Sequence, residues 1–128
     1  MADRHNQDRR FRKSERLKEE KDFKRLFTRG FRLRGRLMML ACIRSEGERS
    51  RAGIVAGKRV GNAVARSRAK RLLREAYRLE KHRLTTPCDL AFVASPNINR
   101  AALKDVQAEA ARLLEDAVER LDDERNSR

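Results

Sequence analysis

The sequence is poor in the residues that build several common classes of protein. It has no tryptophan, two cysteines and two prolines, and only 5% of its 128 residues are aromatic. Cys42 and Cys88 lie far apart, inside the apolar stretches MMLACI and CDLAFVA, and lack the C-x-x-C spacing of a zinc site. We therefore expect two buried, reduced thiols in a cytosolic protein, and neither a disulfide framework nor a zinc site.

Long hydrophobic runs are also missing. No apolar stretch approaches the roughly 20 residues that a membrane span requires, and the beginning of the chain, MADRH, does not resemble a secretion signal. The pattern favours a cytoplasmic protein with no membrane partner.

Motifs for catalysis are absent as well. The sequence has no Walker loop, no H-E-x-x-H and no nucleophile elbow, and its acidic residues form no pair spaced for acid–base chemistry. His5 lies in a polar tail and His82 between Lys81 and Arg83, and neither has an evident catalytic partner. Taken alone, the chain is predicted to bind rather than to catalyse.

Positive charge is what the sequence has in excess. The 33 Lys and Arg residues outnumber the 19 Asp and Glu residues, which gives a net charge of +14. Most of these cations are arginines, which suit bidentate phosphate binding and stacking on bases. The length corresponds to one domain. The composition therefore predicts a single domain that binds a polyanion.

The stretch Lys58–Arg78, KRVGNAVARSRAKRLLREAYR, concentrates this charge. Gly61-Asn62 is a turn and cap signal, and nothing interrupts a helix from Asn62 to beyond Arg78. At helical spacing one face is apolar, with Ala65, Ala69, Leu72, Leu73, Ala76 and Tyr77. The opposite face carries Ser67, Arg71, Arg74 and Arg78, flanked by Arg68 and Lys70. The pattern predicts one face in the core and one basic face.

The beginning of this helix gathers further cations, because Lys58 and Arg59 precede it and Arg66 and Arg68 lie in its first turns. Cations are unfavourable at the positive end of a helix dipole, whereas an anion is stabilised there. A solvated basic face is the simpler alternative. Only Glu75 offsets the row, however, and like charges four residues apart repel, so we favour nucleic-acid contact.

The remaining elements are predicted from periodicity and turn residues. Residues 1–13 are expected to form a flexible basic arm, 14–29 a helix ended by Gly30, and 31–36 a half-exposed strand edge. An apolar strand over 37–43 is expected to form a hairpin with 52–56 through a turn at 46–48. A central strand over 88–94 precedes a second long helix over 100–121, with a flexible tail at 122–128. The domain, residues 14–121, is predicted to be a single α/β sandwich.

Two aromatic residues of the first helix permit two interpretations. Phe23 and Phe27 are four residues apart and share a helix face. Their spacing by itself favours core packing, and a stacking platform for unpaired bases is the alternative.

The motif at Lys58–Arg78 closely resembles the protein subunit of bacterial ribonuclease P. That family carries K-x-x-G-N-A-V-x-R-N-R-x-K-R-x-x-R-E on its second helix. Matching positions are Lys58, Gly61, Asn62, Ala63, Val64, Arg66, Arg68, Lys70, Arg71, Arg74 and Glu75. The upstream stretch Arg16 to Gly30 is similar to the family's first helix, so the resemblance covers about residues 14–121.

The resemblance implies an α+β fold of order αβββαβα, with one mainly antiparallel sheet and a left-handed β-α-β crossover. It also implies an RNA-binding subunit of a ribonucleoprotein endoribonuclease that removes the 5′ leader of precursor tRNA, with the catalytic centre and its Mg²⁺ held mainly by the RNA. The implied partners are the ribonuclease P RNA and precursor tRNA, and no DNA is expected. A structural ribosomal RNA-binding protein of similar fold is the alternative.

The resemblance also assigns residues. RNA binding falls to Lys58, Arg59, Asn62, Arg66, Ser67, Arg68, Lys70, Arg71, Arg74 and Arg78, and no catalytic residue is implied. A cleft between the first helix and the sheet would hold the leader, which favours stacking for Phe23 and Phe27. Two residues depart from the family. Ser67 replaces an Asn and loses its bidentate geometry. Ala41 stands where many relatives have an aromatic on the cleft floor, which predicts one base stack fewer, roughly 1–3 kcal/mol.

Overall fold

The fold alternates helices with strands in the predicted order αβββαβα. The computed structural model describes residues 10–126. Its main elements are α2 (Glu20–Arg29), β1 (Phe31–Arg34), β2 (Met38–Arg44), β3 (Arg51–Val55), α3 (Ala63–Glu80), β4 (Cys88–Ala94) and α4 (Leu103–Asn126). Three short 3-10 turns join them: η1 (Lys13–Glu15), η2 (Lys81–Arg83) and η3 (Pro96–Arg100). The predicted α+β class is confirmed.

The four strands form one sheet in the order β1-β2-β4-β3. β2 pairs antiparallel with both β1 and β4, whereas β3 runs parallel to β4, so β3, α3 and β4 form the β-α-β crossover unit. The predicted hairpin between residues 37–43 and 52–56 is therefore wrong. β4, which is almost entirely buried, lies between these two strands because it is apolar on both faces.

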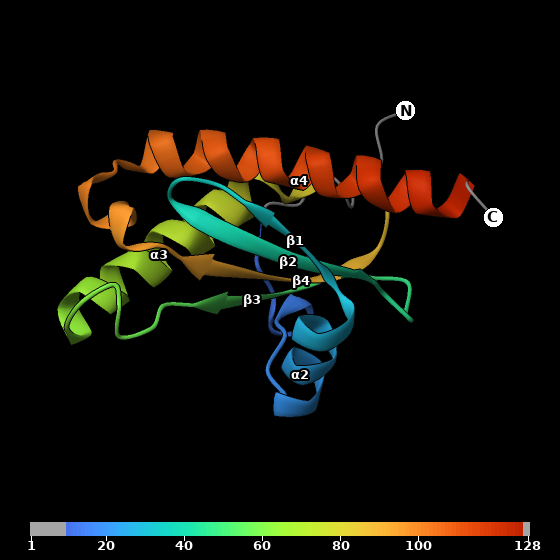
Figure 1. Cartoon of the computed structure of the whole chain (residues 1–128), viewed down its shortest axis with the longest axis horizontal. Coiled ribbons are helices and arrows are strands. Elements are labelled where there is room, and N and C mark those ends of the chain that lie inside the picture. Colours follow the sequence, from blue (N-terminus) through green and yellow to red (C-terminus); the bar gives the residue numbers. More distant parts are fainter. Residues whose placement is uncertain (1–9, 127–128) are drawn as a thin grey trace.

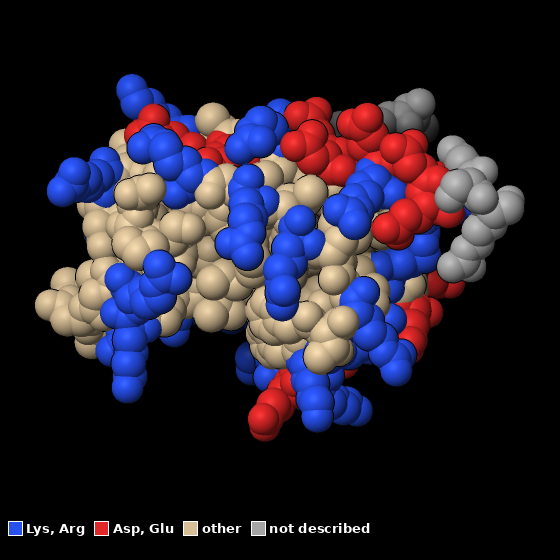
Figure 2. Space-filling view, in the orientation of Figure 1, with Lys and Arg blue, Asp and Glu red and all other residues tan. Residues whose placement is uncertain are grey.

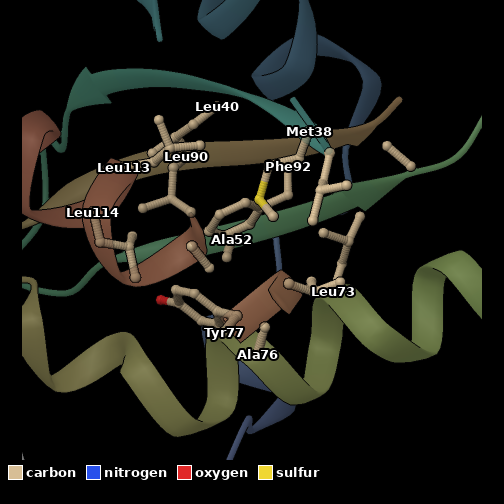
Figure 3. Close-up of a cluster of buried hydrophobic side chains, with 14 of the residues drawn as sticks. Met38, Leu40, Ala52, Leu73, Ala76, Tyr77, Leu90, Phe92, Leu113 and Leu114 are labelled. Atoms are coloured by element: carbon tan, nitrogen blue, oxygen red, sulfur yellow. The ribbon is translucent and has the colours of Figure 1, made fainter. Parts of the chain in front are cut away.

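One face of the sheet is covered by α3 and α4, and the main hydrophobic core lies between them (Figure 1). Tyr77 and Leu73 of α3, Leu113 and Leu114 of α4, and Phe92 of β4 all belong to this core (Figure 3). The predicted apolar face of α3 is confirmed, since Ala69, Leu73, Ala76 and Tyr77 are buried. Cys42 and Cys88 are buried, free thiols in this layer, as predicted.

The other face of the sheet is covered only in part, by α2 (Figure 1). Leu17, Leu26, Ala41 and Ala91 form a small second core beneath this helix. The helix begins at Glu20, not at Ser14 as predicted. Residues 16–17 are extended instead, because Arg16 bridges to Ala52 and the Leu17 N–H donates to the Ala52 carbonyl at 2.9 Å.

The structure describes part of each end of the chain that was expected to be flexible, and that flexibility stays a prediction. Residues 1–9 of the predicted arm, and residues 127–128 of the predicted tail, lie outside the described residues. Phe11 packs edge-on against Tyr77 with ring centroids 5.1 Å apart. α4 continues through the predicted tail to Asn126. Among residues 10–126, no helix is both long and apolar enough to cross a membrane.

Candidate nucleic-acid interface

The turn that begins α3 presents cations beside a capped helix. Gly61 has φ +144°, a conformation that favours glycine, and an added Cβ would lie 3.0 Å from the Ala65 Cβ. The Asn62 side chain then accepts a hydrogen bond from the Ala65 N–H at 2.9 Å and caps the helix. Lys58 and Arg59 are exposed just before this turn. Asn62 therefore caps the helix, and the exposed cations Lys58 and Arg59 lie beside this cap.

The exposed row of α3 is basic, as predicted. Ser67, Arg71 and Arg74 are exposed and Lys70 is half-buried. Arg71 and Arg74 form no ion pair with any acidic side chain of residues 10–126. Their guanidinium groups are therefore available to phosphates.

Arg78, at the end of this row, has an internal partner. Its Nε and Nη2 donate to the two carboxylate oxygens of Glu75 at 3.0 and 2.5 Å. The hydrogen bond from Arg78 holds the pKa of Glu75 below its usual value. Arg78 therefore contributes less unneutralised charge to the basic face than Arg71 or Arg74.

One arginine of the motif, Arg68, points into the corner between α3 and η3. Arg68 donates to the Ile98 carbonyl at 3.2 Å and to the Ala101 carbonyl at 2.7 Å, which joins α3 to the beginning of α4. Arg66 is half-buried, and its Nε is buried without a hydrogen-bond partner. The residues of the motif are thus divided between holding the helix in place and facing solvent.

On the opposite face of the sheet, α2 covers only part of the strands (Figure 1). The uncovered surface beside this helix is the candidate for the expected leader cleft, and it is called the cleft below. The register aligns Val55, Val93, Met39 and Arg34 in one row across the four strands. The first three are half-buried aliphatic side chains that face away from the main core. Strands spaced about 4.8 Å apart make this row about 14 Å long. It forms an apolar floor across the sheet.

Phe23 and Phe27 of α2 form the wall of this cleft. Their rings are stacked, with centroids 6.3 Å apart and planes at 17°, and both are half-buried against the small second core. Gly53 permits the close approach of Phe23, because a Cβ there would lie 2.5 Å from two ring atoms. The two rings therefore pack against the sheet and also keep part of their surface accessible.

Ala41 does not belong to the open floor. Its side chain is fully buried beneath α2 with Leu26 and Ala91, so it cannot stack on a base. The floor is provided by Met39, two residues earlier on the same face of β2. That the cleft stacks one base fewer because of Ala41 stays a prediction.

A buried polar network attaches α2 to the sheet. Asp89 of β4, 2% exposed, accepts hydrogen bonds from Arg51 of β3 at 3.1 and 2.8 Å. Arg51 also contacts Asp22 of α2 at 3.3 Å, and Arg25 of α2 lies 3.6 Å from Asp89. This network was not predicted from the sequence. The charged residue in the otherwise apolar stretch CDLAFVA was the signal that could have indicated it.

The basic helix and the aromatic cleft lie on opposite faces of the sheet, but they meet at one end of it. Lys58 and Arg59 follow Val55, the β3 member of the cleft floor, after two residues. Basic side chains also gather over β1 and α2, whereas acidic ones gather over the C-terminal half of α4 (Figure 2). Among residues 10–126, no His, Cys, Asp or Glu side chains are grouped so as to hold a metal ion.

Comparison with known proteins gives a consistent result. The family model described as ribonuclease P matches residues 11–118. The chain is 33% identical to the ribonuclease P protein component of Alkaliphilus metalliredigens, over 77% of this chain and 88% of that protein. It is 35% identical to the protein of the same name from Clostridium novyi, over 82% of this chain and 95% of that protein.

Solved structures agree with the sequence comparison. The RNase P protein of Staphylococcus aureus superposes with a TM-score of 0.73 at 26% identity, over 82% of this chain and 96% of that one. The RNase P protein of Thermotoga maritima gives a TM-score of 0.71 at 26% identity, over 79% and 96%. The chain belongs to the ribonuclease P protein family.

Proposed function

We propose that this chain is the RNA-binding subunit of a ribonucleoprotein ribonuclease P, which removes the 5′ leader of precursor tRNA. Its partners are then a catalytic RNA and a precursor tRNA, in the cytoplasm. The protein supplies binding and orientation, and the RNA carries the hydrolytic centre. The observation that carries the proposal is the stacked pair of Phe23 and Phe27 beside an open apolar floor. The exposed cations Lys58 and Arg59, which have no acidic partner among residues 10–126, lie next to this floor.

In this proposal the basic residues around α3 bind the catalytic RNA. The residues assigned to it are Lys58, Arg59, Asn62, Arg66, Ser67, Arg68, Lys70, Arg71, Arg74 and Arg78. Arg71 and Arg74 contribute most through phosphate contacts, because they are exposed and have no acidic partner among residues 10–126. Arg68 acts mainly by holding the corner of α3 and η3, through its bonds to two carbonyls.

The cleft takes the single-stranded leader. Unpaired bases stack on aromatic side chains with little sequence preference, which suits leaders of different sequence. Phe23 and Phe27 offer two parallel rings, and the floor of Val55, Val93 and Met39 offers an apolar surface beside them. Leader binding in the cleft would hold the precursor on the catalytic RNA.

Magnesium is assigned to the RNA. The described residues offer no cluster of three metal-binding side chains. The protein would instead lower the Mg²⁺ requirement of the RNA, because its cations neutralise phosphates that otherwise repel one another.

The test is reconstitution. Ribonuclease P RNA alone and with this chain is assayed for cleavage of precursor tRNA over a series of magnesium concentrations. We expect the chain to restore cleavage at low magnesium, where the RNA alone is slow. Arg49→Ala, an exposed arginine of the β2–β3 connection, serves as a control for the loss of one charge. No stimulation at any magnesium concentration would contradict the proposal.

A further inference from the structure

The apolar floor of the cleft ends at a row of arginines on β1. Arg34 is paired in register with Met39, and Arg32 with Ala41, so both side chains lie on the same face of the sheet as the cleft. Both residues are exposed, and they are separated by about 6.8 Å along the strand. β1 is the edge strand, so nothing in the sheet lies beyond it.

Arg32 is already held beside the aromatic wall. Its Nη2 donates to the Phe27 carbonyl at 3.0 Å, and its guanidinium carbon lies 5.9 Å from the centre of the Phe27 ring. Neither Arg32 nor Arg34 forms an ion pair with an acidic side chain of residues 10–126. Their charge is therefore available to a nucleic-acid strand that stacks on Phe23 and Phe27 and extends beyond these rings toward β1.

The acidic second half of α4 lies near the other end of β1. Glu109, in the first half of α4, accepts hydrogen bonds from the Arg36 and Leu37 N–H groups, which fixes that half of α4 beside the β1–β2 turn. The acidic second half of α4 therefore lies toward Phe31, where the guanidinium of Arg120 covers the ring at 4.4 Å. A phosphate chain that crosses the floor to Arg34 therefore stays away from the second half of α4.

We propose that Arg32 and Arg34 bind phosphates of leader nucleotides that lie farther from the cleavage site than those stacked on Phe23 and Phe27. The leader then crosses the sheet from the end of β3 to the β1 edge. This inference rests on the proposed function, because it extends the same leader path. The occupant is the single-stranded leader and not the catalytic RNA, since the arginines continue the floor of the cleft and lie on the opposite sheet face from α3.

The experiment measures the affinity of the reconstituted holoenzyme for precursor tRNAs with leaders of graded length, and for mature tRNA. The variants are Arg34→Ala and Arg34→Lys, with Arg49→Ala as the control that removes the same charge at the opposite end of the sheet. Thermal unfolding and affinity for the ribonuclease P RNA are measured for every variant. Because Arg34 is exposed on an edge strand, we expect all of them to fold.

For long leaders we expect Arg34→Ala to weaken binding roughly three- to tenfold and to reduce the slope of log affinity against log salt by about 0.7. Arg34→Lys, which keeps the charge, retains most of the affinity. All variants bind mature tRNA with equal affinity, and likewise a precursor tRNA whose leader is too short to extend past Phe27. The Arg49→Ala variant binds every substrate as tightly as the unsubstituted protein does. This combination of results supports the proposal.

Each of the following results would overturn the proposal. If Arg34→Ala weakens the binding of mature tRNA, or of the ribonuclease P RNA alone, as much as that of the long-leader precursor, Arg34 contacts the catalytic RNA and not the leader. If Arg49→Ala lowers the affinity for the long-leader precursor as much as Arg34→Ala does, Arg34 acts only through the net charge of the protein. If the unsubstituted protein gives a leader preference that does not rise with leader length, the extended path is wrong while the proposed function stands. If it gives no leader preference at all, the proposed function fails as well.

Discussion

Gly53 sets how closely Phe23 approaches the sheet. A methyl group at this position would lie 2.5 Å from two atoms of the Phe23 ring, well inside van der Waals contact. We predict that Gly53→Ala displaces Phe23, destabilises the protein by about 1–3 kcal/mol and weakens precursor tRNA binding. Urea unfolding and precursor affinity are the measurements.

Gly57 provides the matched control for this change. An added Cβ there meets nothing within 4 Å, and its φ lies outside the range that disfavours side chains. Gly57→Ala should therefore leave stability within about 0.5 kcal/mol of the unsubstituted protein. If both substitutions have the same effect on stability and on precursor binding, the ring of Phe23 is not what Gly53 accommodates.

The two cysteines are predicted to be chemically inert in the folded protein. Both side chains are fully buried. A hydrogen bond with Cys88, together with burial, raises the pKa of Cys42, so its reactive thiolate form is suppressed. A thiol reagent at mildly alkaline pH should label neither residue before unfolding and both after it. Rapid labelling of the folded protein would contradict the burial of this pair.

At the scale of the element, the arginines of α3 are predicted to contribute unequally to RNA binding. Arg71 is exposed without an acidic partner among residues 10–126, whereas Arg78 is bound through two hydrogen bonds to Glu75. Arg71→Ala should weaken binding of the ribonuclease P RNA and lower the salt slope by about one contact. Arg78→Ala should change both quantities less. Equal losses in a salt titration would show that the pair with Glu75 opens when RNA binds.

The contact between the end of α3 and α4 should make stability depend on pH. Burial raises the pKa of Glu80, but hydrogen bonds from Gln107 and Arg83, each 2.7 Å long, outweigh burial and hold the pKa below its ordinary value of 4.5. Because the native pKa is depressed, the carboxylate stabilises the fold fully above about pH 4.5 and less as pH falls through the native pKa.

Glu80→Gln tests this dependence. We expect the variant to lose about 1–3 kcal/mol of stability at neutral pH, because hydrogen bonds to a charged group are replaced by weaker ones. The difference from the unsubstituted protein should shrink in acid, as measured by urea unfolding at several pH values. A difference that stays constant with pH would show that the carboxylate charge is not involved.

How well each element could be predicted depends on whether its causes are local. α3 was predicted to within one residue at its beginning, because Gly61 and Asn62 supply the turn and the cap and the apolar spacing supplies the buried face. The beginning of α2 was missed because the hydrogen bond from Leu17 to Ala52 keeps residues 16–17 extended. The hairpin was wrong because β4, from much later in the chain, lies between β2 and β3. No local sequence pattern indicates the contact of Leu17 with Ala52 or the position of β4 between β2 and β3.

At the scale of the whole molecule, the same distinction applies to the site. The basic face of α3 could be predicted, because its residues recur at helical spacing along one segment. The floor of the cleft could not, because Met39, Val55 and Val93 come from three strands and are aligned only by the register of the sheet. The position of Ala41 beneath α2 is also a consequence of tertiary packing.

The sheet explains how one small domain has room for the two RNA-binding surfaces proposed above. α3 and α4 cover one face completely, and the outer side of α3 is basic. α2 covers only part of the other face, attached by a few apolar side chains and by the network around Asp89, and leaves the floor of the cleft accessible. A catalytic RNA on the first side and a leader on the second could therefore be bound at the same time.

The most direct test of this arrangement is the affinity of ribonuclease P RNA for precursor and for mature tRNA, measured with and without the protein. We predict that the protein strengthens binding of the precursor much more than binding of mature tRNA. Phe27→Ala should remove most of that difference while the complex with the ribonuclease P RNA still forms. Equal strengthening of both substrates by the unsubstituted protein would contradict leader binding in the cleft and leave only the basic face of α3 with a role in RNA binding.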